Sequence, residues 1–257
     1  MKEDLTPKNI EKPDFGDSAE FPIMPLRNTV LFPQQVIPIY IGREKSLHLI
    51  GDLDKGTKKY IVVVAQEDGS IEDPGKEDLY AYGTLAHVLK VFEMPDNSKS
   101  AIVQGISRVK ILDYTKDEPY YEAAVTQLEE IELSEDLELD ALSNNLRQSF
   151  ADLIKIAPNL TDEHTGMLSN IQKPNRLADR AISLMTLSNS EKQEILEELD
   201  VKARVEKSIK IISREIQRIK LGEEIQTEVH DEIAKTQREY YLREQMKAIK
   251  KELGEDE

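Results

Sequence analysis

One segment, DVKARVEKSIKIISREIQRIKLGEEIQTEVHDEIAKTQREYYLREQMKAIKKEL at residues 200–253, determines the architecture of the C-terminal part. Its large apolar residues recur every three or four positions within three successive runs, and the apolar face drifts around the helix from one run to the next. They are Val205, Ile209, Ile212, Ile216, Ile219, Ile225, Val229, Ile233, Leu242, Met246, Ile249 and Leu253. The pattern predicts one long amphipathic, coiled-coil-like helix within residues 200–257, about 80 Å long at about 1.5 Å per residue. Gly222 lies where the register changes, so we expect a hinge there.

The segment before this helix, residues 131–199, predicts an α-helical bundle. Apolar side chains recur at helical spacing from Leu139 to Ala157, and Pro158 ends that pattern. An acidic run, EEIELSEDLELD at residues 129–140, precedes the first helix. It lacks the aspartate spacing of a calcium loop, so we interpret it as a solvated linker rather than a cation site.

Capping residues predict where the helices of the bundle begin. Ser134 is the expected N-cap of the first helix, and Thr161 is the expected N-cap of a short second one. Pro174 fits the first turn of a third helix. Ser190 and Gln193 match a capping box that opens a fourth.

Residues 21–130 carry the signals of β-strands. The continuous apolar run YIVVVA at residues 60–65 is typical of a strand buried on both faces. Prolines interrupt two other runs, FPIMPL at 21–26 and VIPIYI at 36–41. Because proline cannot donate to a strand ladder, these two runs predict edge or bulged strands.

Further elements complete this β-rich part. Residues 82–92 and 100–112 flank PDNS at 95–98, which predicts a hairpin. Residues 121–128 predict a last strand, and apolar spacing within 43–53 predicts the one helix of this region. The sum is a small, mostly antiparallel barrel or sandwich.

Composition excludes several classes of protein. The chain has 257 residues and a formal charge of −16, which disfavours nucleic acid and anionic membranes as partners. It has no cysteine, and therefore no disulfide scaffold or thiol nucleophile. Residues 1–20 are polar, which predicts a disordered tail without a secretory signal. We therefore expect a cytoplasmic protein with no membrane partner.

Sequence motifs of catalysis are absent. There is no phosphate-binding GxxxxGK[ST] loop, no GxGxxG and no GxSxG nucleophile elbow. None of the four histidines lies in an HExxH pattern. We therefore expect no catalytic, cofactor-binding or metal-ligating residue in this chain.

Two segments are more specific than any periodic pattern. One is FPIMPLRNTVLFP at residues 21–33, followed by PIYIGREKS at 38–46, and the other is QREYYLREQMKAIKKELGE at 237–255. The first resembles the opening of the N-terminal domain of Lon, the ATP-dependent protease family, and the second resembles the segment that leads into its ATPase module. Shorter Lon-like matches lie between them, namely DPG at 73–75, YGT at 82–84 and RLAD at 176–179.

The resemblance implies an α+β architecture: a PUA-like β-barrel or sandwich over residues 21–130, a helical bundle over 131–199 and a long helix over 200–257. In Lon these parts precede an AAA+ ATPase and a peptidase with a Ser–Lys dyad, in a hexameric enzyme. Neither the phosphate-binding loop of an ATPase nor a serine peptidase motif occurs in this sequence, so the resemblance implies a chain truncated before the ATPase module. ATP and magnesium are implied only for the part that is absent.

The resemblance also implies a function. It is a non-catalytic region that recognises misfolded and selected regulatory proteins and supports the hexamer. Its partners would be unfolded or damaged proteins and other Lon subunits. The alternative is a stand-alone PUA-like module for a peptide or small ligand. PUA-like folds also bind RNA, but the acidic charge argues against that.

One set of candidate contact residues lies on the long helix: Tyr240, Tyr241, Leu242 and Met246. They predict contact with a substrate or a neighbouring subunit, or a seam that packs on the chain's own bundle or coil. Three nearby lysines, Lys247, Lys250 and Lys251, are interpreted as a solvated face rather than a DNA contact.

A second set lies in the β-rich part and consists of Pro25, Leu26 and Arg27. These residues predict either one wall of a peptide groove or a turn at the end of a strand.

Overall fold

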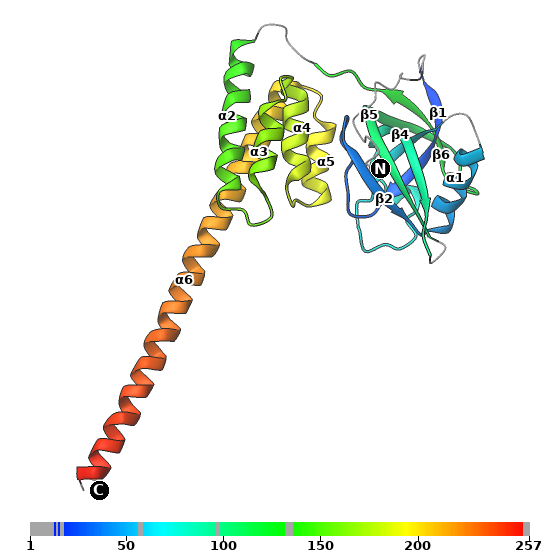
Figure 1. The fold of residues 1–257 in the computed structure, drawn as a ribbon. Helices are drawn as coiled ribbons and strands as arrows, with labels where there is room; N and C mark the ends of the chain where they lie inside the picture. Colours follow the sequence, from blue (N-terminus) through cyan, green and yellow to red (C-terminus); the bar gives the residue numbers. More distant parts are fainter. Residues whose placement is uncertain are drawn as a thin grey trace, which may run out of the picture.

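The computed structural model describes Pro13, Phe15 and residues 18–55, 59–95, 98–131 and 136–253. It has three parts, as Figure 1 shows: a β-domain, a group of short helices beside it, and one long helix that projects away from both. The predicted disordered tail falls almost entirely outside the described residues. Its last two residues, however, already belong to the first strand, β1 (Ala19–Leu26).

Six strands form a single sheet that closes into a barrel. Besides β1 they are β2 (Val36–Ile41), β3 (Tyr60–Ala65), β4 (Tyr82–Glu93), β5 (Lys99–Lys116) and β6 (Glu122–Gln127). The strand order is β2-β5-β4-β3-β1-β6, and an additional β5–β6 pairing closes the sheet. β1 and β3 are parallel, and all other pairs are antiparallel. The predicted hairpin is therefore β4–β5, and the barrel is mostly antiparallel as expected.

The two proline-containing strands occupy different places. β2 pairs only with β5 and is an edge strand, as predicted. β1 is not an edge strand, because it lies between β3 and β6. Its first half pairs with β6 through Pro22, and its second half pairs with β3 from Ile23 to Leu26. Each half is thus paired on one side only, which leaves room for a residue that lacks an N–H.

The barrel core is built from β-branched and aliphatic side chains of all six strands. β3 is buried along nearly its whole length, which confirms the reading of its apolar run. Helix α1 (Glu44–Lys55) places Leu49 and Ile50 against this core. Gly83 of β4 is required sterically, because a Cβ there would lie 2.5 Å from the backbone oxygen of Val63. A short 3₁₀ turn, η1 (Lys76–Asp78), lies between β3 and β4.

Four helices of the bundle follow: α2 (Leu137–Ile154), α3 (Asp162–Ser169), α4 (Pro174–Leu184) and α5 (Asn189–Glu197). Thr161 is the N-cap of α3 and Pro174 is the first residue of α4, as predicted. The predicted cap Ser134 lies outside the described residues, and Asp136 accepts the N–H groups of Glu138 and Leu139 at the start of α2.

The capping box predicted for α5 is wrong by two residues. The structure has Ser188 and Glu191 in those roles instead of Ser190 and Gln193. The Ser188 hydroxyl accepts the Glu191 N–H, and the Glu191 carboxylate accepts the Ser188 N–H at 3.0 Å. This reciprocal pair satisfies two N–H groups at once and starts the helix two residues earlier.

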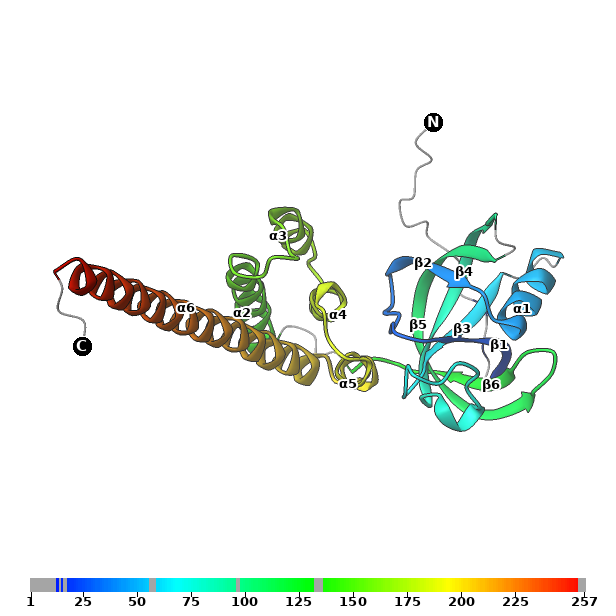
Figure 2. The ribbon, with the colours of Figure 1, turned by 90° about the horizontal axis from the view of Figure 1, so that it is seen from below.

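The last helix, α6 (Val201–Leu253), is continuous over 53 residues. Its first turns pack on α2 and α4, where Val201, Val205 and Ile212 belong to the core of the bundle. Figure 2 shows α5 lying between the start of α6 and the barrel. The amide Nε2 of Gln193 on α5 donates to the Tyr82 oxygen at 3.0 Å, so the bundle is bonded directly to β4. Among the described helices, none combines the length and apolarity needed to cross a lipid bilayer.

Candidate functional site

The outer part of α6 exposes a long apolar surface. From Leu221 to Leu253 every side chain of the helix is solvent-exposed. We call the following residues the exposed stripe: Leu221, Ile225, Val229, Ile233, Tyr240, Tyr241, Leu242, Met246, Ile249 and Leu253. Each is at least half exposed, and Tyr240 reaches 67%. One interpretation of Tyr240, Tyr241, Leu242 and Met246 was a seam that packs on the chain's own bundle. That interpretation is wrong for the described residues, because no part of the described bundle covers these side chains.

Gly222 lies at the base of the exposed stripe. α6 passes through Gly222 without interruption, so the static structure has no break at the predicted hinge. A Cβ built on Gly222 would meet no other heavy atom within 4 Å. Motion about this residue stays a prediction.

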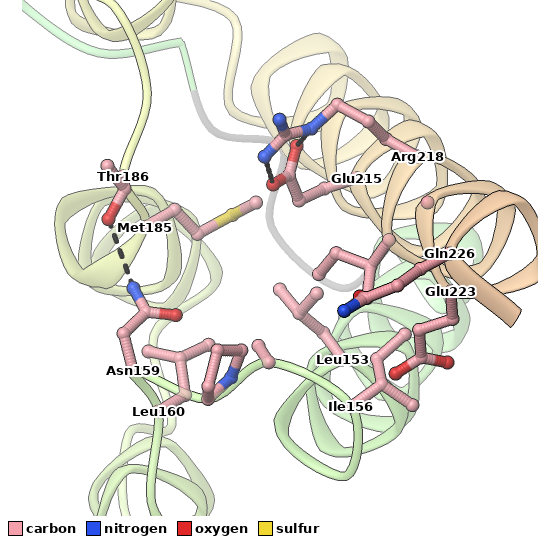
Figure 3. Close-up of a pocket in the computed structure, with 14 residues that line it drawn as sticks. Leu153, Ile156, Asn159, Leu160, Met185, Thr186, Glu215, Arg218, Glu223 and Gln226 are labelled. Carbon is pink, nitrogen blue, oxygen red and sulfur yellow. Dashed lines mark hydrogen bonds and ion pairs between the residues drawn. The ribbon is translucent and has the colours of Figure 1, made fainter. Parts of the chain in front are cut away.

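A cavity of about 710 Å³ opens beside Gly222, where α6 leaves the bundle. Figure 3 shows its walls, which come from the end of α2, the loop that follows α2, the end of α4 and one face of α6. Its inner surface is apolar, with Leu153, Leu160 and Met185 almost fully buried. The polar groups are at the rim, where the Asn159 amide donates to the Thr186 hydroxyl at 3.0 Å.

The charged side chains at the rim of this cavity leave one acid unpaired. The Arg218 guanidinium donates to both carboxylate oxygens of Glu215, with Nε to Oε2 at 2.9 Å. Glu223, one turn further along α6, also lines the cavity. Within the described residues no basic group lies at ion-pair distance from the Glu223 carboxylate. The cavity therefore combines an apolar interior with one uncompensated negative charge.

A second feature, the buried ion cluster, joins the β-domain to the bundle. Arg108 of β5 holds Asp179 of α4 in a two-pronged contact, with nitrogen–oxygen distances of 2.6 and 3.0 Å. Arg204 of α6 lies 3.5 Å from the same carboxylate. Glu130, in the segment between the two parts, accepts from Arg108 at 2.8 Å and from Arg204 at 2.5 Å. Four charged groups thus connect three regions of the fold.

Backbone oxygens complete the bonding of this cluster. The Arg108 Nε donates to the oxygen of Leu196 at 2.8 Å, and Arg204 donates to the oxygen of Glu198. Buried charges are tolerated when their remaining donors are satisfied in this way. In the described part of the chain none of the four residues lines the cavity at the base of α6, and we assign the cluster the structural role of fixing the barrel against the bundle.

Burial and charge act in opposite directions on the two acids of the cluster. Complete burial raises the pKa of Asp179, although the nearby guanidinium groups of Arg108 and Arg204 oppose the rise. Glu130 is less enclosed, and the same two arginines outweigh its desolvation, so the pKa of Glu130 lies below its usual value.

The contact residues predicted in the β-domain have different surroundings. Leu26 is packed in the barrel core, and Pro25 is paired with Val64 inside the sheet. Arg27 is exposed just after β1 ends, where its side chain donates to the Gly69 oxygen. Arg27 borders a second cavity, of about 660 Å³. Its rim carries both acids, such as Glu72, and bases, such as Arg43, and therefore favours no single ligand charge.

In the described ranges no three His, Cys, Asp or Glu residues are close enough to hold a metal ion together. The three lysines near the end of α6 are exposed, and the Lys247 amine pairs with Glu244 at 2.8 Å.

Comparison with known proteins identifies the family. The family model of the ATP-dependent protease La (LON) substrate-binding domain matches residues 20–214. The chain belongs to the Lon family. The matched range contains the barrel, the bundle and the anchored start of α6, and it ends before the exposed stripe begins.

Curated Lon relatives extend the similarity to the rest of the chain. The Lon protease of Koribacter versatilis is 42% identical over 245 residues, which is 95% of this chain and 30% of the relative. The Lon protease of Dictyoglomus thermophilum is 39% identical over 91% of this chain and 29% of its own length. The chain therefore spans about a third of the length of these Lon proteases.

Solved structures share the fold. The N-terminal domain of the Mycobacterium avium complex Lon protease superposes with a TM-score of 0.60 at 21% identity, covering 76% of this chain and 98% of that one. A Lon N-terminal domain protein from Xanthomonas campestris gives 0.53 at 18% identity, covering 73% and 95%. Over about three quarters of its length, the chain thus has a fold similar to that of these Lon N-terminal domains.

Two functional features were not predicted from the sequence. The cavity is walled by three separate elements, and its one local signal was Gly222, a glycine inside a helical pattern. The ion cluster brings together residues far apart in the chain. Its signal was the Lon-like stretch at residues 176–179, which ends in Asp179.

Proposed function

We propose that this region of Lon captures unfolded or damaged proteins, including selected regulatory ones, for a motor and peptidase that lie elsewhere in the protease. In this proposal the region performs no catalysis itself, and ATP with magnesium is used only by the motor. It works in the cytoplasm, and its long helix also contacts other Lon subunits in a hexamer.

The single observation that carries the proposal is the exposed stripe of α6. Folded soluble proteins seldom leave large apolar side chains together in water, and such surfaces mark sites of interaction. An unfolded client exposes the complementary apolar residues, whereas a folded protein buries them. Met246 adds a flexible, polarizable contact that suits clients of different sequence.

Anchorage of α6 supports transfer of a client over a distance. The first turns of the helix are fixed in the bundle, and the bundle is bonded to the barrel by the buried ion cluster. A client bound to the projecting part would therefore be held away from the barrel, near the C-terminal end of α6 at Leu253.

The test is fluorescence anisotropy of this chain titrated into a labelled, permanently unfolded protein, with the folded form of the same protein as control. We expect saturable binding to the unfolded form and about tenfold weaker binding to the folded form, a difference of about 1.4 kcal/mol. Equal affinity for both forms, or no binding at high micromolar concentration, would contradict the proposal.

A variant separates the exposed stripe from the rest of the chain. Replacing Tyr240, Tyr241, Leu242 and Met246 together by serine removes apolar surface that is already in water, so the fold should remain stable. We expect this variant to lose most of the binding. A matched control replaces polar residues of the same turns, Arg243→Ser and Gln245→Ser, and should bind nearly as the unchanged chain does.

A further inference from the structure

Gly222 is unexpected where it stands. Glycine in the interior of an exposed helix costs about 1 kcal/mol relative to alanine. A kink would explain such a residue, but α6 runs through Gly222 unbroken. Close packing would explain it too, but a Cβ would meet nothing within 4 Å. Its one structural distinction is that it lines the cavity at the base of α6.

The absence of a side chain on Gly222 keeps the mouth of that cavity open. The neighbouring α6 residues that line it, Ile219 and Glu223, stand on either side of the glycine along the helix. Any larger side chain on Gly222 would project from the helix into this open space. A volume of about 710 Å³ is within the range of about 300–1,000 Å³ that is common for binding pockets.

The chemistry of the walls indicates what the cavity would accept. Ile156, Pro158 and Ile219 are partly or largely exposed and offer apolar surface to large aliphatic or aromatic side chains. At the rim, Arg218 is neutralised by Glu215, whereas Glu223 has no basic partner among the described residues. A basic residue next to the apolar side chain would complement this carboxylate.

Position favours a polypeptide as the occupant. Leu221 and Ile225, the first members of the exposed stripe, flank the cavity residues Gly222 and Glu223 on the same two turns of α6. A segment bound at this first part of the exposed stripe would therefore lie next to the mouth of the cavity.

We propose that this cavity is a client subsite, in which a large apolar side chain of an unfolded polypeptide is inserted past Gly222 while an adjacent lysine or arginine pairs with Glu223. The inference rests on the proposed function and locates one point of capture on the molecule. It makes Gly222 a determinant of access and Glu223 a determinant of sequence preference.

The first experiment fills the mouth of the cavity in the full 257-residue chain. Gly222→Leu adds a side chain with better helix propensity than glycine, so α6 should be retained. Gly166→Leu in α3 is the matched control, because a Cβ there also meets nothing within 4 Å and the site is remote from the cavity lining. Circular dichroism and thermal unfolding check that both variants keep the helical content of the unchanged chain.

Binding is measured by anisotropy against the labelled, permanently unfolded protein. We expect Gly222→Leu to raise Kd about tenfold and Gly166→Leu to leave it unchanged within about twofold. Unchanged binding by Gly222→Leu would overturn the subsite but leave the proposed function standing. An equal loss in both variants would also overturn it, because the effect would not depend on the cavity. Absence of binding by the unchanged chain would overturn both proposals.

A second experiment tests the charge. The probes are a labelled Gly/Ser-rich peptide that carries Phe, Leu and Arg in sequence, and its counterpart with Glu in place of Arg. We expect the Arg peptide to bind the unchanged chain about threefold to fivefold more tightly, the scale of an exposed ion pair. Glu223→Gln should remove this preference, whereas Glu228→Gln, further along the exposed helix, should keep it. A preference that survives Glu223→Gln would contradict the assignment.

Discussion

The two halves of α6 both carry apolar residues at helical spacing, but their surroundings are opposite. In the anchored half, Val205 and Ile212 are fully buried against α2 and α4. In the projecting half, Ile225 and Ile233 are each 53% exposed. The helix is continuous between them, so backbone geometry does not distinguish the halves.

The comparison shows that an apolar stripe specifies a surface that needs a partner without specifying the partner. The anchored half finds its partner within the chain, through aliphatic contacts and the buried ion cluster. The projecting half keeps the same kind of surface in water, which is the property that the proposed capture of clients requires. Three predictions test how far the halves differ.

The largest difference should appear between a buried and a surface arginine of the anchored half. Arg204 is fully buried in the ion cluster, and Arg204→Ala would leave the Asp179 and Glu130 carboxylates with one arginine between them. Breaking a buried ion pair costs about 3–5 kcal/mol. Arg214, two to three turns later, pairs with Glu191 at the surface, so Arg214→Ala should cost at most about 1 kcal/mol. Urea unfolding of both variants measures the two costs.

A smaller difference is expected for isoleucine. Ile212→Ala leaves a void in the bundle core and should lower the free energy of unfolding by about 2–4 kcal/mol. Ile225→Ala removes a side chain that is half in water and should change it by about 0.5 kcal/mol or less. Similar losses in both variants would mean that the projecting half is buried in solution, for example against a second copy of the chain.

The smallest of the three effects depends on pH and concerns how the anchored half is held. The pKa of Glu130 is lowered in the fold, so its charge stabilises the folded state above its unfolded pKa of about 4.3. That contribution is lost as pH falls through the lower folded value. Glu130→Gln should therefore cost about 1–3 kcal/mol at pH 7.

The same variant should approach the stability of the unchanged chain at about pH 3, where more of Glu130 is protonated. The raised pKa of Asp179 acts in the opposite sense, since acidification favours its buried neutral form. The Glu130 charge contributes to that rise, so Glu130→Gln also lessens it. Urea titrations at the two pH values give the comparison. A cost that does not shrink in acid would show that Glu130 acts through shape rather than charge.

Much of the fold was predictable because local patterns agreed with it. The buried strand β3, the β4–β5 hairpin, the caps at Thr161 and Pro174 and the long helix all follow from residues close together in the sequence. The place of β1 was not predictable, because proline indicates a missing hydrogen bond but does not say which neighbour lacks it. β1 resolves this by changing partners at its middle.

The candidate site was less predictable than the fold. The ion cluster depends on Arg108, Glu130, Asp179 and Arg204, whose pairing is a property of the tertiary structure. The sequence predicts a hinge at Gly222, whereas in the structure Gly222 lines a cavity. Local pattern cannot reveal a cavity whose walls come from three elements.

The ion cluster also has a consequence for synthesis on the ribosome. The barrel is complete once β6 has emerged, at Gln127, yet Arg108 is bonded to Asp179 and faces the charge of Arg204, which are translated much later. At about 5–20 residues per second, several seconds separate these events. During that interval Glu130, which follows the barrel directly in the sequence, is the one carboxylate of the cluster that can pair with Arg108. Asp179 then adds a second carboxylate, and Arg204 balances the two carboxylates with a second guanidinium, so the cluster is complete only when the start of α6 has been translated.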